Sequence, residues 1–286
     1  MQPCVFLDRD NTIIANDGDL GDPTHIRLIE GAAWGIRALR EAGYLVVVVT
    51  NQGGVARGKY VESDVLRVHE QIDALLKKES QWPGTDPFIC DWLFCPYHPE
   101  GTVHKFRREH PWRKPAPGML LEAAKRFEID LATSWMVGDQ ERDVEAGRAA
   151  GCRAIRISPR LIDHAEVRAS SAADFVECDL LHASNRIVHS DGRPGASMWK
   201  ETNSARILAV AGQLSDAQRR EVVRATAHAL AERAGVALAH VTVDEAGVAF
   251  EIIGAEIVAL GFAAELRRTT NHWAASHGIA PLWVSG

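Results

Sequence analysis

Residues 5–14, with the sequence Val-Phe-Leu-Asp-Arg-Asp-Asn-Thr-Ile-Ile, decide the fold of the first part of the chain. An apolar run stops abruptly there at two carboxylates, Asp8 and Asp10. Side chains alternate along a strand, so both can lie just past its end, where open α/β sheets bind ligands. Two carboxylates in that place favour a cation site, or a nucleophile beside a general acid and base. Taken alone, the pattern is equally typical of an acidic turn.

A repeated alternation of strands and helices runs through residues 1–188. Strand-like runs follow the first one at 44–49, 89–94, 135–137, 154–157 and 175–176. Helical patterns lie between and after them, at 31–42, 62–78, 118–127, 143–150 and 180–187. The run at 44–49 is β-branched and uninterrupted, as in a parallel strand that is buried on both faces. The alternation predicts the α/β class, with a parallel sheet flanked by helices and right-handed crossovers.

Polar groups follow two more strands and close one long loop. They are Thr50 and Asn51 after the strand at 44–49, Arg113 and Lys114 at the end of the irregular stretch 95–117, and Asp139 and Asp143 after the strand at 135–137. A long connection without regular structure is usually functional. The carboxyl ends of parallel strands share one edge of a sheet, so we expect these groups at the same edge as Asp8.

Composition narrows the class of protein. The chain has 286 residues, 46% hydrophobic and 24% charged, as in a globular protein of one large or two modest domains. A net charge of -6 argues against nucleic acid as the main partner. No apolar run approaches the roughly 18 residues of a membrane helix. The five cysteines are scattered and no basic leader precedes the first strand, so we expect a reduced, cytoplasmic protein.

The ordered motifs of residues 3–188 resemble those of the haloacid dehalogenase (HAD) superfamily. Short matches are similar to one branch of it: Asp-Arg-Asp-Asn-Thr at 8–12, Thr-Asn-Gln at 50–52, Ala-Arg-Gly at 56–58, Cys-Pro at 95–96, Phe-Arg at 106–107, Arg-Lys-Pro at 113–115 and Pro-Gly-Met at 117–119. That branch contains heptose 1,7-bisphosphate phosphatases and histidinol-phosphate phosphatases. The resemblance implies a HAD-like (Rossmannoid) core without a large cap domain, in which loops shape the pocket.

The resemblance also implies a mechanism. Asp8 would attack phosphorus and become an aspartyl-phosphate, while Asp10 would protonate the leaving alcohol and then deprotonate water. Mg²⁺ would be bound by the Asp8 carboxylate, the Asp10 backbone carbonyl and Asp139. These residue types suit that chemistry, because an anionic nucleophile that meets a phosphate dianion needs a cation to offset the repulsion. An acid at position 10 favours a phosphatase over relatives that only carry the phosphoenzyme.

Further residues receive roles from the resemblance. Lys114 and Thr50 would hold the phosphoryl oxygens, and Asp143 would orient Lys114. Asp143 has a simpler interpretation as an acid that favours a helix N-terminus. The positions assigned to substrate binding in this way are Asn16, Asp17, Gly18, Asp19, Asn51, Gln52, Gly53 and Arg113. On composition alone, residues 16–19 are equally well a plain turn.

The long loop departs from the branch, whose members usually carry a structural zinc between a Cys-x-His and a Cys-x-Cys pair. Here the first pair reads Cys95-Pro-Tyr97 and the second reads His110-Pro-Trp112. A rearranged site would use Cys95, His98, His104 and His110. Their spacing follows no standard finger, so we expect no structural zinc, with Tyr97 and Trp112 packing in its place. Gln140 is a second departure, since the branch often has lysine there.

The remaining third of the chain carries a different pattern. Residues 189–204 are polar, with Gly and Pro, and predict a linker. From 205 to 286 strands are expected at 206–211, 238–243, 248–253 and 281–284, and helices at 215–234 and 255–277. This βαββαβ order predicts a smaller ferredoxin-like α+β domain, which resembles no family that we recognise. We expect it to pack or to form a homo-oligomer, with a ligand sensor or a lid over the pocket as alternatives.

The sequence therefore predicts a Mg²⁺-dependent phosphomonoesterase of a small phosphorylated metabolite. The expected substrate is heptose 1,7-bisphosphate, with loss of the 7-phosphate, and histidinol phosphate is the alternative. A competing class is a non-catalytic regulatory protein that binds a phosphorylated ligand. A protein that has lost catalysis usually lacks one of Asp8, Asp10, Lys114 and Asp139, and all four are present. This favours the enzyme.

Overall fold

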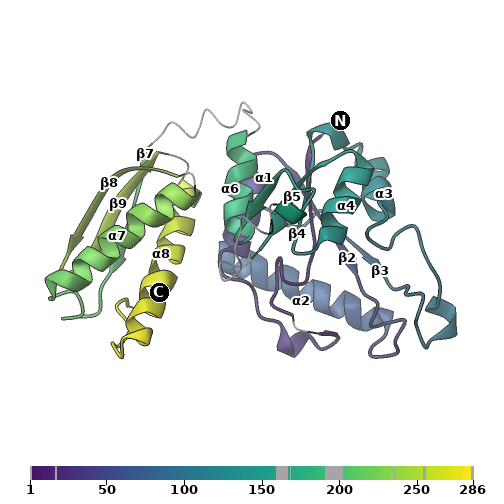
Figure 1. The fold of residues 1–286 in the computed structure, drawn as a ribbon, viewed down its shortest axis with the longest axis horizontal. Coiled ribbons are helices and arrows are strands. Elements are labelled where there is room, and N and C mark those ends of the chain that lie inside the picture. Colours follow the sequence, from purple (N-terminus) through teal and green to yellow (C-terminus); the bar gives the residue numbers. More distant parts are fainter. Residues whose placement is uncertain are drawn as a thin grey trace. The chain divides into compact units, whose positions relative to one another are not determined.

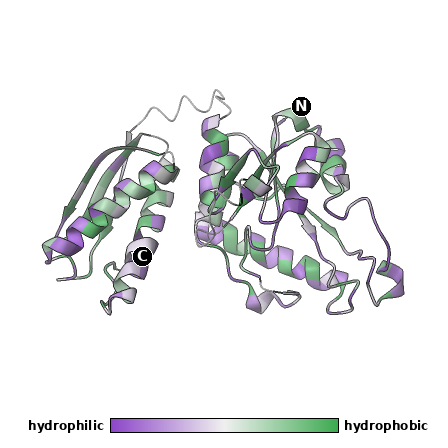
Figure 2. Ribbon diagram, viewed as in Figure 1, coloured by the Kyte–Doolittle hydropathy of each residue, from purple (hydrophilic) through white to green (hydrophobic). Residues whose placement is uncertain are grey.

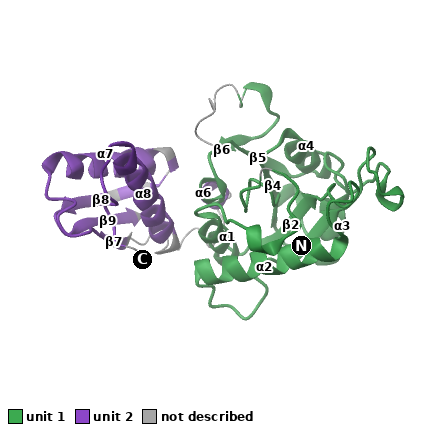
Figure 3. Cartoon of the chain, turned by 90° about the horizontal axis from the view of Figure 1, so that it is seen from below, with its two compact units in different colours: residues 1–184 green, residues 185–286 purple. Residues whose placement is uncertain are grey.

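The computed structural model describes residues 2–16, 18–158, 167, 169–190, 202–234, 236–253 and 256–284. The chain divides into two compact units, residues 1–184 and 185–286 (Figure 3). Most of the predicted linker, residues 191–201, lies outside the described residues. Its two ends are not linker, because helix α6 (Leu180–Ser190) and strand β7 (Thr202–Leu208) extend into 189–204.

Unit 1 is built on one six-stranded sheet, as the sequence predicted (Figure 1). Its strands are β1 (Cys4–Leu7), β2 (Leu45–Asn51), β3 (Asp91–Cys95), β4 (Trp135–Gly138), β5 (Arg153–Ile157) and β6 (Phe175–Glu177). They stand in the order β3-β2-β1-β4-β5-β6, and every pair is parallel. The strands are largely hydrophobic, as parallel strands buried on both faces must be (Figure 2).

Helices cover both faces of this sheet. They are α1 (Ala32–Glu41), α2 (Glu62–Ser80), α3 (Gly118–Phe127), α4 (Glu141–Ala150) and α6, with short 3₁₀ turns η1 (Pro23–His25), η2 (His104–Phe106) and η3 (Leu131–Thr133). Helix α1 packs on α2, and α3 packs on α4. Phe6, Val47 and Val49 point from β1 and β2 into one core with Met119 and Leu120 of α3, and all five are fully buried. The predicted α/β class is confirmed.

The register of the central strands determines where the polar strand ends lie. Leu7 of β1 pairs with Val48 of β2 and with Val137 of β4. The residues that follow, Asp8 and Gly138 among them, therefore lie at the same level of the carboxyl edge. This is the edge at which open α/β sheets bind ligands.

A buried histidine connects α2 to the edge strand β3. His69 is 3% exposed, and its ring stacks on Trp92 at 4.6 Å between centroids and meets Phe94 edge-on. Neither ring nitrogen has a hydrogen-bond partner within the described part of the chain. Burial, with a smaller contribution from Arg9, lowers the pKa of His69 to about 3. The folded protein therefore holds a neutral imidazole in an apolar layer.

Acid is expected to destabilise unit 1 through His69. Below pH 6.5 the unfolded chain binds a proton that the folded chain excludes, so stability falls as pH falls from 6.5 towards 3. At pH 5.5 this site costs about 1.4 kcal/mol of unfolding free energy. Urea denaturation at pH 7.5 and 5.5 measures this effect. In His69→Leu, the unfolding free energy should no longer contain this loss at pH 5.5. The exposed control, His104→Leu, should keep the wild-type pH dependence. If His104→Leu also stopped losing stability between pH 7.5 and 5.5, the assignment to His69 would be contradicted.

Unit 2 is an α+β domain with an antiparallel sheet. It contains β7, α7 (Ala217–Ala234), β8 (Ala237–Asp244), β9 (Gly247–Ile253) and α8 (Glu256–Ser276), and its strand order is β7-β9-β8. The Asp244 carboxylate accepts hydrogen bonds from the backbone of Ala246 and Gly247 and closes the β8–β9 hairpin. Among the described residues, no helix of either unit is both long and apolar enough to cross a membrane.

Two sequence-based bounds in unit 2 were wrong. The strand expected at 206–211 is β7, and it begins earlier because Thr202 already pairs with Ile253 of β9. Its first residues are polar, so hydrophobicity alone missed them. The strand expected at 281–284 is reduced to one antiparallel bridge, between Trp283 and Ala209 just after β7. That bridge stands beside β7, where the fourth strand of the predicted ferredoxin-like order would lie.

Candidate active site

A buried lysine joins three elements at the carboxyl edge of the sheet. Lys114 is 2% exposed, and its Nζ donates to Asp8 Oδ1 at 2.6 Å and to the carbonyl of Val49 at 2.7 Å. The same Nζ lies 2.7 Å from Asp143 Oδ1. Asp8 follows β1 and is 4% exposed, so the ammonium group and both carboxylates are withdrawn from solvent. The sequence-based pairing of Asp143 with Lys114 is present in this geometry.

Asp143 has a second task at the start of α4. Its Oδ2 accepts a hydrogen bond from the backbone N–H of Gln140, at 3.0 Å, so it caps the helix as well as pairing with Lys114. Gly138 makes room for this arrangement, since a Cβ there would stand 2.5 Å from the Asp143 side chain. The Gln140 amide donates to Asp139 Oδ2 at 2.7 Å. Glutamine at position 140 therefore orients Asp139.

Three carboxylates gather around this single lysine. Oxygens of Asp8, Asp139 and Asp143 all lie within 4.8 Å of one another. Burial raises the pKa of Asp8 to about 7; Lys114 opposes the rise, and Asp143 adds to it. Burial also raises the pKa of Asp139. Lys114 offsets only one of three negative charges, so the cluster favours a further cation. An all-oxygen donor set of this kind fits Mg²⁺.

Asp10 faces a different group of side chains from Asp8. Arg9 is fully buried and its Nη2 donates to both carboxylate oxygens of Asp10, at 3.0 and 3.1 Å. Gln52 donates to Asp10 at 3.0 Å, and Asn16 donates at 2.7 Å. The carboxylate of Asp10 is therefore fixed at the wall of a cavity. Sequence reasoning missed Arg9, although its place between the two carboxylates was a signal.

Two predicted substrate residues hold protein groups instead. The side chain of Asn51 makes two hydrogen bonds with the backbone of Lys114, each 3.0 Å long, and so positions the lysine. Gln52 is 2% exposed and donates to Thr50 Oγ1 at 2.9 Å, while it accepts from the Tyr60 hydroxyl at 2.8 Å. Gln52 thereby connects Thr50 to Asp10. Sequence reasoning missed Tyr60, which no motif marks.

A polar cavity of about 210 Å³ opens beside these groups. It is lined by Asp10, Asn11, Asn16, Gly18, Asp19, Asn51, Gln52, Gly53, Arg57, Tyr60, Arg113 and Arg142. The predicted substrate residues are therefore brought together, except for Asp17, which lies outside the described residues. Asp19 is paired with Arg57 across the wall at 2.5 Å.

Two arginines give the cavity a positive side. Arg113 donates to the carbonyl of Tyr97 at 3.3 Å, and within the described ranges the side chain of Arg142 makes no hydrogen bond or ion pair. Burial lowers the pKa of Arg113, and the charge of Arg142 contributes to the same effect. Two like charges that face one cavity favour an anion between them. Sequence reasoning missed Arg142. The signal was its place in the first turn of the helix that begins shortly after Asp139.

The long loop does not assemble the four ligands that a rearranged zinc site would need. Across the described ranges, Cys95, His98, His104 and His110 form no group of converging ligand atoms. Cys95 Sγ is directed at the Tyr97 carbonyl, and His110 Nδ1 accepts from the backbone of Trp112 at 3.1 Å. The Tyr97 ring stacks on His110 at 4.3 Å between centroids. Aromatic packing is therefore the observed organisation of this loop.

Comparison with known proteins places this geometry in a family. The HAD-hydrolase-like family model matches residues 111–183. A D-glycero-β-D-manno-heptose-1,7-bisphosphate 7-phosphatase of Rhodopseudomonas palustris is 41% identical over 163 residues, which are 57% of this chain and 87% of that protein. A protein of the same name from Escherichia coli K12 is 37% identical over 175 residues, 61% of this chain and 87% of its own length.

A solved structure agrees with these matches. The D,D-heptose 1,7-bisphosphate phosphatase from B. bronchiseptica, complexed with magnesium and phosphate, superposes with a TM-score of 0.55 and 26% identity. The superposition covers 65% of this chain and 98% of that one. About two fifths of this chain lie outside the alignments with the two sequence relatives. The chain belongs to the HAD family of phosphatases, as its motifs predicted.

Proposed function

We propose that this protein is a Mg²⁺-dependent phosphatase that removes the 7-phosphate from heptose 1,7-bisphosphate. The observation that carries the proposal is the buried Asp8–Lys114–Asp143 group with Asp139 beside it, in a chain whose named relatives are heptose 1,7-bisphosphate 7-phosphatases. A structural ion pair alone would not need a third carboxylate. A nucleophile that must meet a phosphate dianion needs a bound cation, and the third carboxylate is a ligand for one.

The proposed reaction uses two carboxylates, Asp8 and Asp10. An oxygen of Asp8 attacks phosphorus, and the bond from phosphorus to the sugar oxygen breaks. Asp10 gives its proton to that leaving oxygen. Asp10 then takes a proton from water, whose oxygen attacks the aspartyl-phosphate. Inorganic phosphate leaves, and the Asp8 carboxylate is restored.

The groups around Asp8 support the transferred phosphoryl group. Lys114 and Thr50 would hold its oxygens, and Asn51 fixes the backbone of Lys114. Asp8, Asp139 and the Asp10 carbonyl would hold Mg²⁺, while Asp143 is engaged with Lys114. A bound Mg²⁺ supplies charge neutralisation for the nucleophile and the phosphoryl oxygens.

The positive side of the cavity favours a bisphosphate over histidinol phosphate. Arg113 and Arg142 would bind the phosphate that is not transferred. Histidinol phosphate offers a single phosphate and a cationic amine, which two arginines would repel. The two substrates share the chemistry at Asp8, so this part of the cavity distinguishes them.

Removing Arg142 is expected to weaken the use of the bisphosphate. In Arg142→Ala, kcat/KM for heptose 1,7-bisphosphate should fall by about 10- to 150-fold, since a charged hydrogen bond is worth roughly 1.5–3 kcal/mol. Hydrolysis of heptose 7-phosphate should stay within about 2-fold of wild type by the same reasoning. Arg148→Ala is a matched control on the same helix, because Arg148 pairs with Asp174. Equal losses on both substrates would contradict a role at the second phosphate.

The substrate assignment is tested by phosphate release with Mg²⁺ from both anomers of heptose 1,7-bisphosphate and from histidinol phosphate. We expect one heptose anomer to exceed histidinol phosphate in kcat/KM by at least about 100-fold. A higher kcat/KM for histidinol phosphate would overturn the heptose assignment but leave the proposed mechanism unchanged. Tight binding of a heptose bisphosphate without any release would support the regulatory alternative instead.

A further inference from the structure

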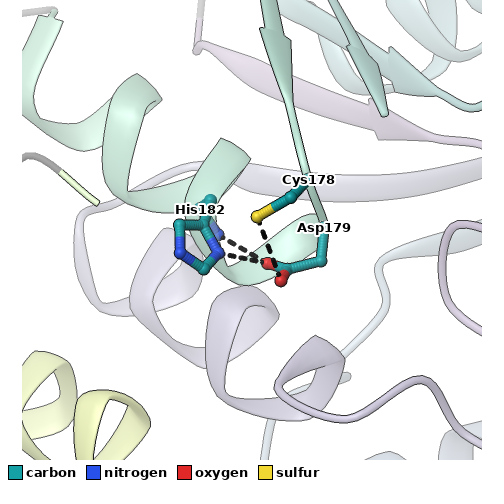
Figure 4. Close-up of side chains that lie close together, drawn as sticks. All are labelled: Cys178, Asp179 and His182. Carbon is teal, nitrogen blue, oxygen red and sulfur yellow. Dashed lines mark hydrogen bonds and ion pairs between the residues drawn. The ribbon is translucent and has the colours of Figure 1, made fainter. Parts of the chain in front are cut away.

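A second group of metal-ligand side chains lies at the end of β6. Cys178 and Asp179 directly follow this strand, and His182 lies in the first turn of α6 (Figure 4). In the sheet order, β5 separates β6 from β4, which ends at the candidate active site. The polar cavity of that site is lined by other residues. The group is therefore separate from the phosphatase chemistry.

The three side chains converge on one point. Cys178 Sγ lies 3.4 Å from Asp179 Oδ2, and His182 Nδ1 lies 2.6 Å from Asp179 Oδ1. The three ligand atoms all lie within 4.8 Å of one another. Figure 4 shows the thiol and the ring nitrogen directed at the same carboxylate from two sides. Cys178 is 9% exposed and His182 is 3% exposed, so the group is sheltered from solvent.

These separations are close to those of a tetrahedral metal centre. Metal–ligand bonds of about 2.0–2.3 Å at a tetrahedral angle place neighbouring ligand atoms about 3.3–3.7 Å apart. The distance from Cys178 to Asp179 already lies in this range. The pair of Asp179 and His182 would have to open by less than about 1 Å. The two distances end on different oxygens, Oδ2 and Oδ1, so the carboxylate would turn to present one of them to the ion.

The ligand types select the metal. Zn²⁺ prefers thiolate and imidazole ligands, with carboxylate as a common third type. Mg²⁺ prefers oxygen, so the thiol of Cys178 makes this group unlike the carboxylate cluster around Lys114. We propose that Cys178, Asp179 and His182 bind Zn²⁺, with a fourth position for a water molecule. The bound ion would tie the end of β6 to the start of α6.

Helix capping explains only part of this arrangement. Asp179 Oδ1 accepts a hydrogen bond from the backbone N–H of His182 at 3.0 Å, as an N-terminal cap does. The cap does not require the ring nitrogen and the thiol to meet the same carboxylate. Burial alone would lower the pKa of His182, but its interactions with Asp179 and Cys178 raise it to about 10. Zn²⁺ would replace the imidazolium proton and the thiol proton.

The test is titration of the metal-free full chain with Co²⁺ and Zn²⁺ in excess Mg²⁺, which occupies the carboxylate cluster. Co²⁺ bound to a thiolate gives an ultraviolet charge-transfer band that oxygen-bound Co²⁺ lacks. We expect one equivalent to give this band and Zn²⁺ to remove it. Cys178→Ser should abolish the band, and His182→Gln should weaken Zn²⁺ binding at least about 100-fold. Asp179 is left intact, because it caps α6.

Cys95→Ser is the matched control, since Cys95 is also buried and ends β3, directly before the long loop. It should keep the band and the Zn²⁺ affinity. Circular dichroism of each variant checks that α6 and the rest of the fold are retained. A folded wild-type chain that gives no thiolate band would overturn the proposal. A band lost in Cys95→Ser and kept in Cys178→Ser would overturn it too, and would move the metal to the long loop.

Discussion

Asp8→Asn is expected to lower kcat by at least about 10⁴-fold, because an amide cannot form the acyl-phosphate and no other group replaces the nucleophile. The fold should be retained, since the amide oxygen of the substituted side chain can still accept the hydrogen bond from Lys114. In Mg²⁺-free buffer its unfolding free energy should equal or exceed the wild-type value. The variant removes one of three crowded carboxylates, and burial has already raised the pKa of Asp8 to about 7.

The measurement pairs phosphate release with urea denaturation of the same preparation. Asp91→Asn is a matched control, because it makes the same chemical change at the opposite end of a strand, where Asp91 pairs with Arg126 on the surface. It should leave kcat within about 2-fold of wild type, as surface substitutions away from special features usually do. Activity of Asp8→Asn within 10-fold of this control would contradict nucleophilic catalysis by Asp8.

Lys114→Met is expected to cause the largest loss of stability of any single change at the site. It leaves Asp8 and Asp143 buried without their shared cation, and breaking such a buried group typically costs about 3–5 kcal/mol. Turnover should be lost as well, because the lysine is proposed to hold the phosphoryl oxygens. Chemical denaturation in Mg²⁺-free buffer gives the free energy of unfolding.

A second variant separates charge from packing. Lys114→Met combined with Asp143→Asn removes one of the two stranded charges, so it should recover part of the stability and none of the activity. Added Mg²⁺ should also stabilise Lys114→Met more than it stabilises the wild-type protein, since it replaces the missing positive charge. If Lys114→Met alone were as stable as wild type, the buried charges would not be coupled as described.

Local signals allowed most of unit 1 to be predicted. The uninterrupted apolar run before Thr50 predicted β2, and the abrupt carboxylates after Leu7 marked the end of β1. Both signals lie within a few consecutive residues, so they can be recognised without knowledge of the fold. The parallel register then brings the strand ends to one edge, so the group of Asp8, Lys114 and Asp139 followed from the order of the motifs.

Side-chain partners across the site could not be predicted in the same way. Asn51 carried a substrate role in the sequence pattern, but it bonds to the backbone of Lys114, 63 positions along the chain. Arg142 reaches the cavity only because α4 starts directly after the strand end. Polar Thr202 joins β7 because β9 offers it a ladder partner, which hydrophobicity does not reveal.

The long loop is organised by aromatic packing. Tyr97 and Trp112 were expected to pack in place of zinc. The ring that stacks on Tyr97 is His110, which the sequence also offered as a ligand. Its Nδ1 accepts a backbone hydrogen bond within its own turn, so the ring is held as a packing group.

Phosphorus-31 NMR of the purified protein with Mg²⁺ and heptose 1,7-bisphosphate tests the central claim most directly. The primary 7-phosphate and the anomeric 1-phosphate give separate signals, so the spectrum shows which bond is broken. The account predicts that the 7-phosphate signal is converted to inorganic phosphate while the 1-phosphate signal remains, and that Asp8→Asn abolishes the change. Loss of the 1-phosphate first, or no release from folded protein with Mg²⁺ bound, would contradict it.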